Sequence, residues 1–109
     1  MKNIRKIDSI DTLEEALNSK QAFIFKNSPL CPISTAAKRE FQEFAQKTDN
    51  NIELYSVDVI SSRNLSQDIE RRTGITHQSP QVILIKNGKP AWNASHWNIT
   101  TNSLKEAVQ

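Results

Sequence analysis

The chain has 109 residues, of which 24% are charged and 37% hydrophobic, and its formal net charge is only +2. This length and balance are typical of a single globular domain, here residues 1–109, whose core is large enough to fold without disulfides or bound metal. The small charge argues against nucleic-acid binding, because no basic cluster matches a phosphate backbone.

The first part of the chain is predicted to form a helix, a strand and a second helix. Acidic residues, Asp11 and Glu14 among them, occur before any apolar stretch, so we expect no secretion signal or membrane span and a cytoplasmic protein. The same two residues have capping-box spacing, which predicts a helix through about Asn18. The apolar run 22–25 predicts a strand covered on both faces. From Pro32, apolar residues at helical spacing predict a helix, and proline suits its first turn.

A second strand and a third helix are predicted in the middle of the chain. The strand covers residues 52–60. Ser61 or Ser62 can cap the helix that follows, and Gly74 ends it. The alternation of strands and helices to this point implies parallel pairing with right-handed crossovers.

A hairpin and a final helix are predicted in the last third. Residues 81–85 and 90–92 are its strands, joined by Asn87-Gly88, a strong turn signal. Thr100 or Thr101 opens the last helix. The whole order is typical of an α/β fold of the thioredoxin-like kind, a mixed central sheet with helices on both faces.

Cys31 is the only cysteine in the chain. An internal disulfide and a zinc site of the cysteine type are therefore excluded. Cys31 lies between the loop after a buried strand and the start of a helix, where free backbone N–H groups and the helix dipole favour a thiolate. Such settings lower a cysteine pKa from about 8.5 to about 3.5–7.5, and the thiolate is the nucleophile in disulfide exchange. The alternative is an inert thiol buried in the core.

Ser34 follows Cys31 by one helical turn, where a dithiol enzyme would carry its second cysteine. Its hydroxyl could donate a hydrogen bond to the sulfur but could not resolve a mixed disulfide. The sequence therefore predicts monothiol chemistry, in which Cys31 takes a small thiol from a mixed disulfide and an external thiol releases it. We expect no bound cofactor and no metal.

Ser79-Pro80 precedes the strand at 81–85. In a thioredoxin-like fold a proline here is usually cis and faces the nucleophile, and the residue before it offers backbone groups to an extended substrate. Only about 5–6% of X–Pro bonds in folded proteins are cis, so this expectation comes from the fold and not from the dipeptide. A trans proline that merely begins the strand is the alternative.

Together these motifs resemble the YtxJ-type monothiol bacilliredoxins. The resemblance covers nearly the whole chain and rests on Cys31-Pro32-Ile33-Ser34, Ser79-Pro80-Gln81, Asn87-Gly88 and Trp92 with Ser95-His96. It implies a thioredoxin-like fold and removal of bacillithiol from S-bacillithiolated proteins, with bacillithiol as co-substrate and the thiolated proteins as partners. It also implies that Cys31 is the nucleophile, with Pro32 and Ser34 beside it and the cis-proline Pro80 opposite. The family usually has threonine where this chain has Leu30, a difference that could alter thiolate stabilisation or substrate orientation.

Lys26 and His96 are weaker candidates for substrate binding. Bacillithiol carries a malate group, so a lysine or histidine near the cleft could pair with its carboxylates. A solvated surface charge is the favoured interpretation of Lys26. His77 and His96 are more simply ordinary polar residues, and Trp92 is more simply a packing residue.

Two other functions remain open. Ser28 lies three residues before Cys31, like the hydroxyl that orients peroxide in thiol peroxidases of the peroxiredoxin type. The proline that such sites place farther upstream is absent, since Ile24 occupies its position. A non-catalytic thioredoxin-fold binding module, in which the cysteine is incidental, is the second alternative. The sequence does not indicate an oligomeric state.

Overall fold

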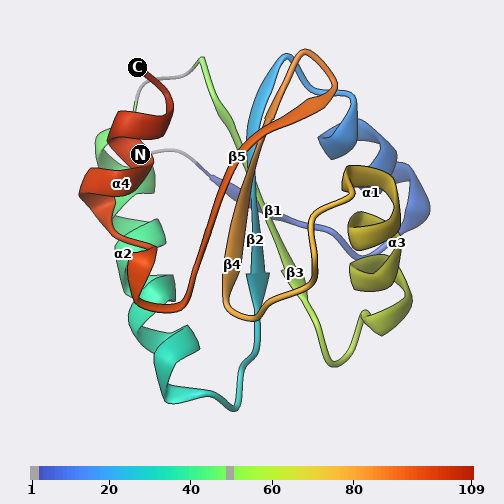
Figure 1. The fold of residues 1–109 in the computed structure, drawn as a ribbon, viewed down its shortest axis with the longest axis horizontal. Helices are drawn as coiled ribbons and strands as arrows, with labels where there is room; N and C mark the ends of the chain where they lie inside the picture. Colours follow the sequence, from blue (N-terminus) through green and yellow to red (C-terminus); the bar gives the residue numbers. More distant parts are fainter. Residues whose placement is uncertain (1–2, 49–50) are drawn as a thin grey trace.

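The computed structural model describes residues 3–48 and 51–109, which form a five-stranded sheet between two layers of helices (Figure 1). The strands are β1 (Ile4–Lys6), β2 (Gln21–Asn27), β3 (Glu53–Asp58), β4 (Gln81–Lys86) and β5 (Lys89–Ser95). The helices are α1 (Ile10–Leu17), α2 (Pro32–Lys47), α3 (Arg63–Thr73) and α4 (Thr101–Ala107), with a short 3₁₀ helix at His96–Asn98.

The strand order across the sheet is β1-β3-β2-β4-β5. β1, β3 and β2 run parallel, whereas β4 is antiparallel to both β2 and β5. Helices α2 and α4 cover one face, and α1 and α3 cover the other (Figure 1). The predicted mixed α/β sheet with helices on both faces is confirmed.

The two faces of the central strand β2 supply two separate apolar cores. Phe23 faces α2 and α4, where its ring meets those of Phe44 and Trp92 edge-on, with centroids 5.3 and 6.0 Å apart. Ile24 belongs to the core beneath α1 and α3. Both residues are fully buried, because a central strand covered on both faces has no solvent-facing side. Trp92 is a packing residue, as predicted.

The N-terminal segment differs from the prediction in two ways. Ile4 begins a strand, β1, which pairs with β3 and was not predicted. Three residues are too few to show a strand periodicity, so only the pairing reveals it. Helix α1 is capped by Ser9 and not by Asp11: the Ser9 hydroxyl accepts a hydrogen bond from the Thr12 N–H at 3.2 Å.

Helix α3 begins after a tight turn that Asp58 holds. Its carboxylate accepts hydrogen bonds from the backbone N–H groups of Ile60 and Ser61, at 2.8 and 3.0 Å. These bonds lower the pKa of Asp58. Ser62 occupies the N-cap position but makes no side-chain capping bond there, while Gly74 ends the helix at φ +73° as predicted.

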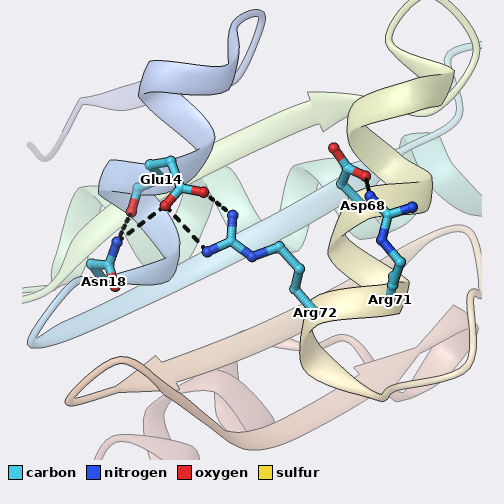
Figure 2. Close-up of polar contacts among 5 residues, drawn as sticks. All are labelled: Glu14, Asn18, Asp68, Arg71 and Arg72. Atoms are coloured by element: carbon cyan, nitrogen blue, oxygen red, sulfur yellow. Dashed lines mark hydrogen bonds and ion pairs between the residues drawn. The ribbon is translucent and has the colours of Figure 1, made fainter.

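Polar contacts on the outer surface join α3 to α1 (Figure 2). The Arg72 guanidinium of α3 contacts both carboxylate oxygens of Glu14 in α1, and Arg71 pairs with Asp68 within α3. Each pair has at least one side chain that is well exposed to solvent, so each contributes little to stability.

The last third of the chain follows the prediction closely. Asn87 and Gly88 both have positive φ, 52° and 75°, as a tight hairpin between twisted strands requires. Thr100 caps α4 through a reciprocal pair of hydrogen bonds with Ser103. None of the helices in the described residues is long and apolar enough to cross a membrane.

Candidate functional site

Cys31 is the N-cap residue of α2, with Pro32 as the first residue of the helix. Its backbone N–H donates to the Ser28 carbonyl at 3.2 Å, and its own carbonyl accepts from the Thr35 N–H at 3.1 Å. The residue is partly exposed, so the alternative of a thiol enclosed in the core is wrong. The thiol is placed at the opening of a helix, where backbone N–H groups have no helical partner.

Ser34 is fully buried one turn into α2. Its hydroxyl accepts a hydrogen bond from the Ser28 N–H at 2.8 Å and donates a hydrogen bond to Asn27 Oδ1 at 3.1 Å. The expected hydrogen bond from this hydroxyl to the sulfur is therefore not formed. Ser34 instead fixes the loop that presents Cys31 to the end of β2. The sequence did not predict that Asn27, a polar residue at the end of the strand, would bind the Ser34 hydroxyl. Its spacing from Ser34 was the only indication of this contact.

The Ser79-Pro80 segment lies at the same end of the sheet as the Cys31 loop. Lys26, near the end of β2, is paired with Gln81, the first residue of β4. The segment that leads from β2 to Cys31 and the segment that leads from Pro80 into β4 are therefore neighbours. The Ser79–Pro80 peptide bond is cis. The Ser79 hydroxyl is buried and has no hydrogen-bond partner in the described part of the chain.

His96 joins this end of the sheet from β5. Its backbone N–H donates to the Pro80 carbonyl at 3.0 Å, and its φ of 54° turns the chain into the 3₁₀ helix. The contact that places His96 beside Pro80 is thus made by its backbone. Two large apolar side chains near these segments are exposed, Leu30 at 86% and Trp97 at 68%.

Lys26 is fully buried, so its interpretation as a solvated surface charge is wrong. Its ammonium donates to Gln81 Oε1 at 3.1 Å, and Gln81 Nε2 donates to the Thr76 carbonyl at 3.1 Å. Burial lowers the pKa of Lys26 to about 8, against the opposing effect of the Glu70 carboxylate. Enclosed in this way, the ammonium supports the loop before Pro80 and does not lie on the surface where it would meet a substrate carboxylate directly. Gln81 was missed as its partner, although it is the one polar residue at the start of an apolar strand.

The described residues contain no group of three or more histidine, cysteine, aspartate or glutamate side chains that could hold a metal ion. A sequence model of the family described as monothiol bacilliredoxin BrxC matches residues 2–104. The chain belongs to the monothiol bacilliredoxin family.

Solved structures with a thioredoxin fold are similar to this chain. One, a proposed oxidoreductase with a thioredoxin fold, is 34% identical to this chain, with a TM-score of 0.89 and coverage of 97% of this chain and 94% of that one. Mitochondrial thioredoxin 3 of Saccharomyces cerevisiae is 13% identical, with a TM-score of 0.78 and coverage of 96% and 92%. Plasmodium falciparum thioredoxin is 15% identical, with a TM-score of 0.74 and coverage of 97% and 95%. The two thioredoxins show the fold alone.

The bacilliredoxin family and the thioredoxin fold make this protein a thiol oxidoreductase. Its one cysteine fits the monothiol form of that chemistry. With one cysteine, this chain has no second thiol that could resolve a mixed disulfide internally.

Proposed function

We propose that this bacilliredoxin removes bacillithiol from S-bacillithiolated proteins through a mixed disulfide on Cys31. The observation that carries the proposal is the position of the single thiol. It is partly exposed at the opening of α2, at the end of the sheet where the Ser79-Pro80 segment enters β4.

The reaction consists of two thiol–disulfide exchanges. In the first, the Cys31 thiolate attacks the bacillithiol sulfur of the mixed disulfide; a Cys31–bacillithiol disulfide forms and the client thiolate leaves with the electron pair of the broken bond. In the second, the thiolate of an external low-molecular-weight thiol attacks the bacillithiol sulfur and releases the Cys31 thiolate. The disulfide passes to the external thiol, so electrons balance over the cycle.

The neighbours of Cys31 have distinct proposed roles. Pro32 begins the helix, and Ser34 holds the Cys31 loop through Asn27 and Ser28. Ser79 and Pro80 form the opposite side of the site, and the His96 backbone fixes Pro80.

The client is proposed to dock on the apolar side chains exposed at this end. Leu30 directly precedes Cys31, and Trp97 follows His96. Large exposed apolar side chains around a reactive group are typical of surfaces that meet other proteins. A protein of this kind would act in the cytoplasm, where thiols are kept reduced.

The proposal is tested by following the release of the client thiol from a bacillithiolated protein. Wild type should release it and Cys31→Ala should not. Equal release by both would refute the proposal. Rapid formation of a sulfenic acid at Cys31 with substoichiometric peroxide would instead favour the thiol peroxidase, and partner binding unaffected by Cys31→Ser, without thiol transfer, would favour the binding module.

A further inference from the structure

A cavity of about 500 Å³ opens between α3 and the end of the sheet. The turn after β3, Val59 and Ile60, forms one wall, α3 forms another, and His77 closes it on the side of the cis-proline segment. The volume lies within the range of about 300–1,000 Å³ that small-molecule sites occupy.

The cavity borders the Cys31 site on two sides. The Val59 N–H donates a hydrogen bond to the backbone carbonyl of Asn27 at 3.0 Å. The side-chain oxygen of Asn27 accepts the hydrogen bond from the Ser34 hydroxyl. On the other side, His77 is two residues before Ser79. The cavity and Cys31 therefore lie at the same end of the sheet, and the cavity belongs to neither apolar core.

Neutral polar groups form one part of the cavity lining. Ser66, which is only 3% exposed, contributes a hydroxyl to the lining. Gln67 adds an amide. Burial, assisted by the charge of Lys26, lowers the pKa of His77 against the effect of Glu70, so the imidazole is largely neutral at pH 7. These groups both donate and accept hydrogen bonds, as the hydroxyls of a ligand require.

Arg63 gives the cavity a free positive charge. In the described part of the chain it makes no hydrogen bond or ion pair, and it is the first residue of α3. A cation is unfavourable at a helix N-terminus, so helix stability does not explain it. The carboxylate of Glu70, which also lines the cavity, already accepts a hydrogen bond from the backbone N–H of His77 at 2.6 Å and lies near the buried Lys26. A guanidinium in this setting is suited to binding a carboxylate.

We propose that this cavity binds the hydroxyl-rich, carboxylate-bearing body of the low-molecular-weight thiol while its sulfur exchanges at Cys31. The proposal rests on the proposed function and adds the part of the protein that distinguishes such a thiol from a smaller one. Ser66, Gln67 and His77 contact the hydroxyls, Arg63 pairs with a carboxylate, and Val59 and Ile60 cover the apolar part of the ligand.

The test compares two mixed disulfides of one client protein, one with bacillithiol and one with free cysteine. The second-order rate constant for transfer of the thiol to Cys31 is measured in a single turnover by quenching and intact mass. Arg63→Gln should lower the rate constant for bacillithiol about ten-fold and leave that for cysteine unchanged. Arg63→Lys should recover part of the lost rate for bacillithiol, because lysine restores the positive charge but not the planar guanidinium that binds both oxygens of a carboxylate.

Arg71→Gln is the matched control, since Arg71 lies on the same helix but pairs with Asp68 (Figure 2) and does not line the cavity. It should change neither rate constant. The inference is overturned if Arg63→Gln leaves the bacillithiol rate unchanged, or if it lowers both rates equally, which would indicate a contact with the client protein. Wild type that accepts neither thiol would instead refute the proposed function.

Discussion

Replacing the buried Lys26 with methionine should stabilise the protein at pH 7. The fall of its pKa from 10.5 to about 8, at about 1.4 kcal/mol for each pKa unit, means that the folded state disfavours the charged ammonium by about 3 kcal/mol. Methionine has a similar length and no charge. It forfeits the hydrogen bond to Gln81, worth about 1 kcal/mol, and Gln81 Oε1 still accepts from the Gln78 N–H at 3.4 Å. The net gain in the free energy of unfolding is about 2 kcal/mol.

The pH dependence identifies the cause. Because the folded pKa is the lower one, the penalty is complete below about pH 8 and is lost as the pH rises toward the unfolded value of 10.5. Urea unfolding followed by tryptophan fluorescence should therefore show Lys26→Met more stable than wild type at pH 7. The difference should shrink from pH 8 upward and leave wild type slightly more stable above pH 10.5, where only the hydrogen bond distinguishes the two proteins.

Lys86→Met, at an exposed lysine on β4, is the control and should show no such pH-dependent difference. A Lys26→Met protein less stable than wild type at pH 7, or a difference that does not change with pH, would refute the reasoning about the buried ammonium.

Other substitutions test the remaining contacts. Ser34→Ala should lower the free energy of unfolding by about 1–3 kcal/mol, since Asn27 and Ser28 lose their partner; unchanged urea unfolding would contradict this. Ser34→Cys should form a disulfide with Cys31 under mild oxidation, detected by the loss of reactive thiols, and failure to form it would contradict the one-turn geometry. Gly74→Ala should cost about 1 kcal/mol, measured by urea unfolding, because φ is +73° there while nothing lies within 4 Å of the added Cβ; a neutral result would contradict the left-handed cap. Arg72→Gln should change the stability by less than about 1 kcal/mol by the same measurement, and a larger loss would mean that its pair with Glu14 is stronger than a surface contact.

The features that sequence predicted correctly are those decided by local chemistry. The junction at Cys31 and Pro32 is set by a proline that can begin a helix but not continue one. The turn at Asn87-Gly88 follows from residues that accept positive φ. The short, continuous apolar run of β2 favours a strand with both faces covered.

The features that sequence did not predict depend on contacts between distant segments. β1 is defined by its pairing with β3 and has too few residues for a pattern. Lys26 is buried at the end of β2, where its ammonium bonds to Gln81 and lies near Glu70 of α3, and a sequence does not show which side of a strand end is covered. The Ser34 hydroxyl bonds to Asn27 rather than to the sulfur because the loop between them folds back.

The central claim is that the sulfur of Cys31 carries the transferred thiol. The most direct test is to incubate the wild-type protein with a stoichiometric amount of bacillithiolated client, quench with acid and locate the added mass by peptide mass spectrometry under non-reducing conditions. We predict one bacillithiol on the peptide that contains Cys31, with an equal loss from the client. A client freed of bacillithiol while Cys31 stays unmodified at every time point would contradict the mechanism.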